Sequence, residues 1–188
     1  MYTHPMKPHF LLVGLGNPGA SYERTRHNAG FIAMDRLSQE FGEGEWKDLQ
    51  KFSATVQEAR IVTVPVLLVK PQTFMNASGE SIVKLLRYYK LDPAIRLMVV
   101  CDDIDLPAGT VRLRTAGGPG THNGLKSIVQ ILGEGFARLR IGIGPQPVEQ
   151  DLASWVLSAL SKDERVKLDT ALDALVPMVR SYVLEDGT

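Results

Sequence analysis

Short apolar runs, typical of buried strands, alternate along the chain with longer segments whose apolar residues recur at helical spacing. The predicted strands are residues 10–13, 53–59, 61–69, 96–101, 110–114 and 137–143. The predicted helices are residues 28–41, the segment that follows Ser78, residues 125–132 and the tail. Strands that alternate with helices predict a single three-layer α/β domain, in which helices flank a mixed, largely parallel sheet.

Local signals mark several ends of these elements. Ser78 is predicted to cap the helix after it, and Ser161–Glu164 has the order of a capping box. Pro65 is expected to bend its strand or place it near an edge, and Pro177 to kink or end the last helix. Residues 1–9, which hold two prolines and two histidines, are predicted to be a loose leader before one domain at 10–188.

Composition narrows the class of protein. Lys plus Arg number 21, as do Asp plus Glu, which argues against a basic protein that coats nucleic acid but leaves room for a local basic patch. The single cysteine, Cys101, excludes an internal disulfide framework and is typical of a reducing compartment. No apolar run approaches the length of a bilayer span. We therefore expect a cytoplasmic protein with no membrane association.

The stretch from Gly14 to Gly30, GLGNPGASYERTRHNAG, leaves the first apolar strand with an unusual density of polar groups. In open α/β sheets, functional sites lie at the carboxyl ends of the strands. Its first glycines match the dinucleotide-binding fingerprint, but that motif needs a helix to begin among the glycines, and here Pro18 and a polar run follow. A catalytic role is therefore favoured over nucleotide binding.

His27 and Asp102 are the candidate general base and its partner. Asp102 ends a different strand at the same predicted edge, where a carboxylate holds an imidazole in one tautomer and stabilises its protonated form. Histidines paired at ligand spacing are missing from the sequence, so we expect no metal site. A Gly-x-Ser-x-Gly elbow is also missing, and Cys101 lies in an apolar run. The predicted chemistry is hydrolysis by water that His27 activates, without a covalent intermediate.

Amide and basic side chains supply candidate binding groups. Asn17, Asn76 and Asn123 each occupy a loop beside a core element, where each alone would be read as a turn residue. Together they predict a site that binds amide and carbonyl groups. Basic residues gather around a second glycine-rich loop, and they are Arg112, Arg114, Lys126, Arg138 and Arg140. They form either solvated strand faces or, with the helix that opens near Asn123, a clamp for a nucleic-acid backbone.

Six short motifs follow one another between residues 14 and 144, within a resemblance to a known family that runs from about His9 to Leu175. They are GLGNPG at 14–19, TRHNAG at 25–30, TFMN at 73–76, DDIDLP at 102–107, HNGLK at 122–126 and RLRIGIG at 138–144. In this order and spacing the sequence closely resembles the bacterial-type peptidyl-tRNA hydrolases. Six motifs in register are far more specific than any one of them.

The resemblance implies hydrolysis of the ester that joins a peptide to the 3′ end of tRNA, with His27 as catalytic base and Asp102 orienting and polarising it. Further roles are implied for Asn17, Asn76 and Asn123 in binding substrate or water, Tyr22 at the acceptor end, Met75 in the peptide groove, and Arg112, Arg114, Lys126 and Arg138 on the tRNA backbone. The family is monomeric and uses no cofactor. A non-catalytic RNA-binding relative of the same fold is the alternative, although the intact His27 and Asp102 favour the enzyme.

Overall fold

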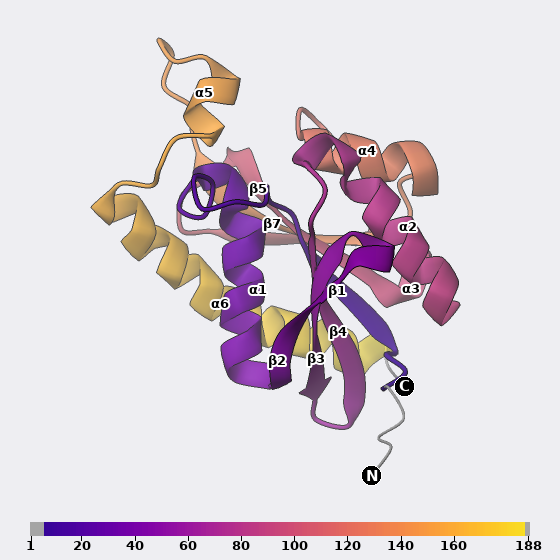
Figure 1. The fold of residues 1–188 in the computed structure, drawn as a ribbon. Helices are drawn as coiled ribbons and strands as arrows, with labels where there is room; N and C mark the ends of the chain where they lie inside the picture. The colour runs from indigo at the N-terminus through magenta and orange to yellow at the C-terminus, as the bar shows by residue number, and fades with distance from the viewer. Residues whose placement is uncertain (1–5, 187–188) are drawn as a thin grey trace.

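The strand Phe10–Gly14 (β1) lies at the centre of a seven-stranded sheet with the order β2-β3-β4-β1-β5-β7-β6 (Figure 1). The computed structural model describes residues 6–186. The other strands are β2 (Gly42–Leu49), β3 (Ala54–Ile61), β4 (Val64–Pro71), β5 (Leu97–Pro107), β6 (Val111–Arg114) and β7 (Ala137–Gly144). The four central strands, β4, β1, β5 and β7, are parallel, whereas β2, β3 and β6 pair antiparallel at the two sides. The predicted mixed α/β sheet is confirmed.

Helices cover both faces of the sheet. The α-helices are α1 (Ala29–Phe41), α2 (Ser78–Tyr89), α3 (Pro93–Arg96), α4 (Asn123–Leu132), α5 (Leu152–Val156) and α6 (Lys162–Asp186). Three single-turn 3₁₀ helices, η1 (Arg26–Asn28), η2 (Gln50–Phe52) and η3 (Met75–Ala77), stand in the connections. No helix within residues 6–186 is both long and apolar enough to cross a membrane.

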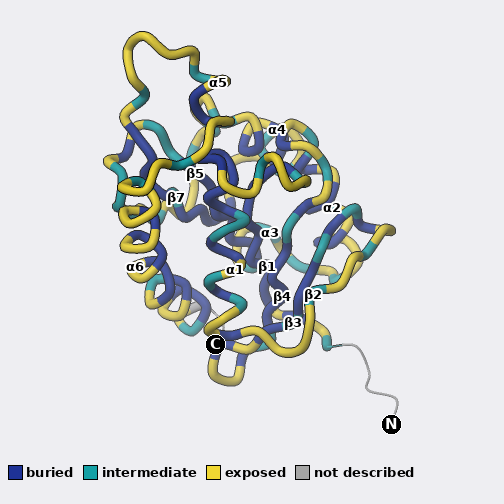
Figure 2. The backbone as a smooth tube through the Cα atoms, turned by 60° about the vertical axis from the view of Figure 1, so that its left-hand side comes forward, coloured by how far each residue is buried: buried dark blue, intermediate teal, exposed yellow. Residues whose placement is uncertain are grey.

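Two hydrophobic cores lie on opposite faces of the sheet, because successive side chains of a strand point to opposite sides. Phe10 and Leu12 face α1 and α6, whereas Leu11 and Val13 face α2 and α4. The central strands and the inner helix faces are accordingly buried, and Figure 2 shows them in dark blue. Both layers of helices therefore reach the carboxyl edge of the same central strands.

The segment from residue 42 to 71 differs from prediction. Gly42 ends α1 as expected, but Gly42–Leu49 then forms the edge strand β2, whose side chains are mostly exposed and give no burial signal. The predicted strand 61–69 is wrong at its start, because Val62, with φ 57°, lies in the turn between β3 and β4. Pro65 is in an interior strand, not at an edge. It is tolerated because pairing of β4 with β1 begins only at Val66.

Three signals at helix ends have different outcomes. The capping box is confirmed, since Ser161 N–H donates to Glu164 Oε2 at 2.7 Å and Glu164 N–H to Ser161 Oγ at 3.3 Å. Ser78 is not a cap: it is the first residue of α2, and its hydroxyl donates to the Met75 carbonyl at 2.9 Å. Pro177 does not end α6, which continues through it.

The predicted leader lies mostly outside the described residues, since residues 1–5 are not among them. His9, just before β1, donates its N–H to the Pro65 carbonyl at 2.7 Å. The end of the segment that the sequence predicts to be loose is thus tied to the sheet.

Two helices begin in very close contact with the sheet. A Cβ added to Gly30 would lie 2.4 Å from both Leu15 N and Val100 O, at the start of α1. A Cβ on Gly124, at the start of α4, would lie 2.6 Å from Met75 Sδ and 2.8 Å from a methyl carbon of Leu15. At Gly30 the overlapping atoms belong to the backbone, so only glycine permits the approach, whereas at Gly124 they belong to side chains that would have to move.

We predict that Gly30→Ala lowers the free energy of unfolding by about 1–3 kcal/mol, because the new methyl group overlaps backbone atoms that cannot move aside. Urea denaturation measures the change. Gly135→Ala is the matched control, since its added Cβ would meet no atom within 4 Å and its φ is not positive. Equal losses in the two variants would contradict the close-packing explanation.

Candidate active site

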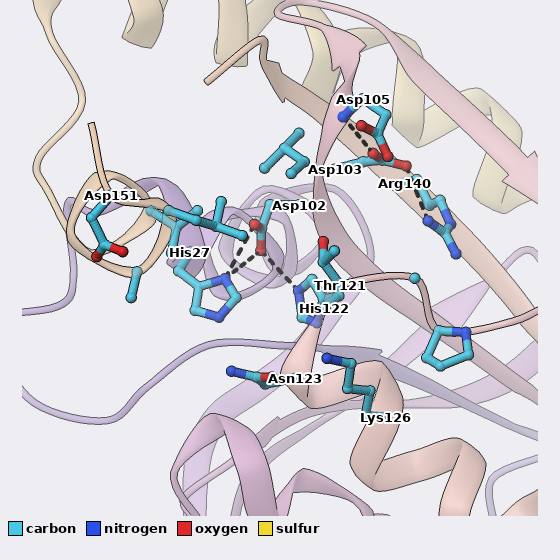
Figure 3. Close-up of a pocket in the computed structure, with 16 residues that line it drawn as sticks. His27, Asp102, Asp103, Asp105, Thr121, His122, Asn123, Lys126, Arg140 and Asp151 are labelled. Atoms are coloured by element: carbon cyan, nitrogen blue, oxygen red, sulfur yellow. Dashed lines mark hydrogen bonds and ion pairs between the residues drawn. The ribbon is translucent and has the colours of Figure 1, made fainter. Parts of the chain in front are cut away.

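The carboxylate of Asp102 lies between two histidine side chains (Figure 3). The predicted strand 96–101 continues as β5 to Pro107, so Asp102 is a mid-strand residue, two positions beyond the last pair of β5 with β1. His27 Nδ1 is 2.9 Å and 3.1 Å from its two oxygens, and His122 Nε2 is 3.0 Å from Oδ1. The Asp102 side chain is only 2% exposed. The predicted approach of His27 to Asp102 is thus observed at hydrogen-bonding distance.

Three separate connections bring these groups together. His27 is the middle residue of η1, the single turn that leads into α1 on one face of the sheet. His122 is the N-cap residue of α4, on the opposite face. Asp102 lies between them because β5 is a central strand, which the connections into α1 and α4 approach from the two faces of the sheet.

The hydrogen bonds fix the tautomers of both imidazoles. Leu125 N–H donates to His122 Nδ1 at 3.3 Å, so this nitrogen carries no proton and Nε2–H donates to Asp102. An ionised Asp102 likewise accepts from Nδ1–H of His27. The lone pair of His27 is therefore on Nε2, which is the arrangement of a general base.

The negative charge of Asp102 is stabilised by its neighbours even though the side chain is buried. Burial alone would raise the pKa of this carboxyl group, because the carboxylate loses its hydration. Attraction to His122 and His27, and the hydrogen bonds that both donate, outweigh burial and hold the pKa of Asp102 well below its usual range. Asp102 is therefore an anion at neutral pH and keeps the His27 tautomer.

A pocket of about 400 Å³ opens beside this cluster. His27, Asp102 and His122 form part of its wall, and residues of the segment 151–156 line it as well, with Asp151 to one side of His27 (Figure 3). Ile104, Leu152 and Val156 add apolar surface, so the pocket combines an activated base with walls that exclude water in part. No motif or periodicity in the sequence indicates that residues 151–156 reach this site.

Three of the four hydrogen-bonding groups of Asn17 have partners: its backbone N–H, its backbone carbonyl and its side-chain Oδ1. Its N–H donates to Asn28 Oδ1 at 2.9 Å, and its carbonyl accepts from Asn28 Nδ2 at 3.0 Å. Its side-chain Oδ1 accepts from Met75 N–H at 2.8 Å. These bonds fix the loop 14–19 against the loop 72–77 and leave Asn17 Nδ2 without a partner among residues 6–186.

The loops of the other two predicted asparagines converge on the same place. Met75 is only 5% exposed and packs against Gly124, so Asn76 and Asn123, the neighbours of these two residues, lie at one edge of the sheet. Both asparagines are exposed, and Asn123 lines the pocket. Tyr22 is half-buried in the turn before His27 and is not among the pocket-lining residues.

The basic residues divide into exposed and buried members. Arg112 and Arg114 are exposed on the edge strand β6, and Lys126 is exposed on the first turn of α4. Arg138 is 0% exposed, and its guanidinium donates to the carbonyl oxygens of Gly117, Gly118, Glu134 and Phe136. The predicted contact of Arg138 with a phosphate does not fit this burial, because its donors already hold the glycine-rich loop.

His122 is the residue of this cluster that sequence reasoning missed. In the sequence it is only part of the HNGLK motif, and histidine is not among the residue types that favour helix N-caps, so the position carries no local signal. Donor atoms of His27, Asp102 and His122 lie within 4.8 Å of one another, a spacing that could hold a metal ion. Their hydrogen bonds already account for the convergence, and the absence of a metal requirement stays a prediction.

Cys101 is a buried core residue and not a candidate catalytic nucleophile. Its side chain is buried in the core between the sheet and the layer of α2 and α4. Burial, with a contribution from the Asp102 charge, raises the pKa of the thiol well above its usual range. This cysteine is therefore a small core residue, as predicted, and not a nucleophile.

Comparison with known sequences agrees with this geometry. The family model described as peptidyl-tRNA hydrolase matches residues 11–188. A peptidyl-tRNA hydrolase of Rhodospirillum centenum is 45% identical over 166 residues, which cover 88% of this chain and 72% of that protein. One from Chloroflexus aurantiacus is 44% identical over 179 residues, or 95% of this chain and 94% of the relative.

Solved structures give the same result. A crystal structure of peptidyl-tRNA hydrolase from Acinetobacter baumannii superposes with a TM-score of 0.88 at 37% sequence identity, over 97% of this chain and 92% of that one. Sequence and fold thus agree along nearly the whole length. The chain belongs to the peptidyl-tRNA hydrolase family.

Proposed function

We propose that this protein hydrolyses the ester bond between the peptide and the tRNA of peptidyl-tRNA, and so recycles tRNA during translation. The observation that carries the proposal is the buried His27–Asp102 pair, 2.9 Å apart, in the wall of an open pocket. An ester needs only an activated water and stabilisation of the developing oxyanion. The family to which the chain belongs supplies the substrate class.

In the proposed mechanism, His27 Nε2 removes a proton from a water molecule as its oxygen attacks the ester carbonyl. The resulting imidazolium is stabilised by Asp102 through the Nδ1 hydrogen bond. Collapse of the tetrahedral intermediate breaks the bond to the 3′ ribose oxygen, which receives the proton from His27. Free peptide and tRNA are the products, and no covalent enzyme intermediate forms.

Amide groups are proposed to bind the reacting ester and its surroundings. Asn17 Nδ2, Asn76 and Asn123 are the candidates, because their loops meet beside the pocket and Asn17 is held rigid by three hydrogen bonds. Preorganised donors of this kind stabilise developing negative charge without reorganisation during the reaction. Tyr22 at the acceptor end and Met75 beside the peptide complete the proposed substrate contacts.

The tRNA backbone is proposed to contact Arg112, Arg114 and Lys126, which are exposed on β6 and α4. Arg138 is proposed instead to support this surface from beneath, by holding the loop 117–118. A cytoplasmic location and a monomeric state belong to the same proposal, supported by the single buried cysteine and by the family resemblance. The alternative of a non-catalytic RNA-binding relative is disfavoured because the base and its partner are intact.

We predict that His27→Ala lowers kcat for hydrolysis of an N-acylated aminoacyl-tRNA by about 10²–10⁴-fold, the usual contribution of a general base. Single-turnover assays with radiolabelled substrate measure the rate. His9→Ala, at an exposed position outside the site, is the matched histidine control. Wild-type rates in a folded His27→Ala protein would refute the assignment of His27 as the base.

We predict a similar loss of kcat, about 10²–10⁴-fold, for Asp102→Asn, because the amide no longer favours the Nδ1–H tautomer of His27. Asp103→Asn is the comparison variant: Asp103 pairs with Arg140 at 3.1 Å rather than with a histidine, so a much smaller loss is expected. Equal losses of kcat in the two variants would contradict a specific role of Asp102 in holding the His27 tautomer, and would point to a general effect of negative charge near the pocket.

Stability gives a second readout for Asp102. Its folded-state pKa is lowered, so its carboxylate stabilises the fold above the unfolded pKa of about 4, and this contribution is lost as the pH falls further. The difference in unfolding free energy between wild type and Asp102→Asn should therefore shrink from pH 7 to pH 3. A difference that is constant over this range would contradict a lowered pKa.

We predict that Arg112→Gln with Arg114→Gln weakens tRNA binding and lowers the slope of log K against log salt by up to about 2, since each lost phosphate contact removes about 0.9. Fluorescence anisotropy with labelled tRNA at several salt concentrations measures both. Arg60→Gln, exposed on β3 in the other half of the sheet, should leave the slope unchanged. An unchanged slope in the double variant would place the RNA elsewhere.

A further inference from the structure

Arg26, the residue before the proposed base, has an almost fully buried side chain whose three guanidinium nitrogens are all hydrogen-bonded. Its guanidinium makes a bidentate pair with Glu164, from Nε to Oε1 and from Nη2 to Oε2, both at 2.8 Å. Its Nη1 donates to the carbonyls of Trp155 and Ser158 at 3.1 Å and 3.2 Å and also to the Ser158 hydroxyl. The guanidinium carbon lies 5.0 Å from the centre of the Trp155 ring.

All these partners belong to residues 155–164, which run from α5 into the first turn of α6. The same Glu164 carboxylate accepts from Ser161 N–H in the capping box, so one side chain fixes both the start of α6 and Arg26. The backbone adds contacts from the same turn, since Leu160 N–H donates to Arg24 O at 2.9 Å. A buried charge is stable only with such partners, and five donors in a planar fork suit arginine rather than lysine.

The segment 151–156 forms one wall of the pocket. Leu152, Ala153 and Val156 of α5 line it together with His27. Asp151, at the start of the same segment, lies to one side of His27 (Figure 3). The chain from residue 145 to 154 is mostly exposed and projects from the rest of the fold with α5 (Figures 1 and 2). Its two ends differ: β7 holds one end in the sheet, whereas the Arg26 contacts hold the other.

We propose that Arg26 is a positioning residue of the hydrolase, which fixes the α5 wall at the correct distance from His27 so that the pocket fits the substrate. The proposal rests on the proposed function for its kinetic readout. We place Arg26 outside the substrate contacts, because its side chain is 10% exposed and each of its three guanidinium nitrogens is hydrogen-bonded to residues 155–164. His27 has separate support from Asp102 and from the close approach of Gly30, so loosening Arg26 affects the α5 wall first.

The kinetic test is Arg26→Lys, which keeps the charge but cannot reproduce the fork of hydrogen bonds. We expect kcat/KM for an N-acylated aminoacyl-tRNA to fall on the order of tenfold to a hundredfold, the cost of a misplaced binding wall, with most of the loss in KM. The matched control is Arg36→Lys, because Arg36 on α1 also pairs with an acidic residue of α6, Asp173, but at an exposed position. That control should keep wild-type kinetics.

A second measurement tests whether the α5 wall stays in place, without an assay of activity. In a Trp46→Phe background, Trp155 is the single tryptophan, and it is only 5% exposed. Arg26→Lys should increase its quenching by acrylamide, whereas Arg36→Lys should not. Glu164→Gln should increase quenching too, and combining it with Arg26→Lys should add little, because both variants break one network.

The outcomes separate the two proposals. If the wild-type protein does not hydrolyse the substrate, the proposed function fails, and quenching alone then judges the role of Arg26 in holding the wall. If Arg26→Lys leaves both KM and quenching at wild-type values, the positioning role is overturned. A loss confined to kcat, with an unchanged KM and unchanged quenching, also overturns it, since the effect would then act on His27 and not on the α5 wall.

Discussion

The active site depends on one buried negative charge. The Asp102 carboxylate is nearly inaccessible to water, and such a group destabilises a protein unless its hydrogen bonds are replaced inside. Two imidazoles replace them, one from each side of the sheet. Because the carboxylate must be satisfied for the chain to fold, the same requirement that stabilises the fold also holds His27 in the tautomer that its chemistry needs.

The backbone makes this meeting possible. Gly30 and Gly124 allow the first turns of α1 and α4 to press against the ends of the central strands, and η1 and His122 come with them. Larger residues at these two positions would push the starts of both helices further from the sheet. Close packing at two glycines therefore converts an ordinary α/β sheet into a frame that holds three side chains at hydrogen-bonding distance.

Several polar residues near the site build the frame rather than perform chemistry. Asn17 and Asn28 bond reciprocally and join the first loop to Met75, and Arg138 ties down the glycine-rich loop. Arg26 does the same for the segment before α6. The groups left exposed, including Asn76 and Asn123, are those free to meet a substrate.

Local pattern in the sequence determined the fold class, the central strands, the capping box and the placing of His27 and Asp102 at one edge, because these depend on burial periodicity and on strand ends. Tertiary structure alone decided the rest. The edge strand β2 lacks a burial pattern, and His122 becomes a partner of Asp102 only when α4 packs beside β5. Residues 151–156 join the pocket because Arg26 bonds to Trp155 and Glu164, which are 129 and 138 positions away in the sequence. The burial of Arg138 is of the same kind, since a charged residue in a strand looks exposed until its carbonyl partners fold around it.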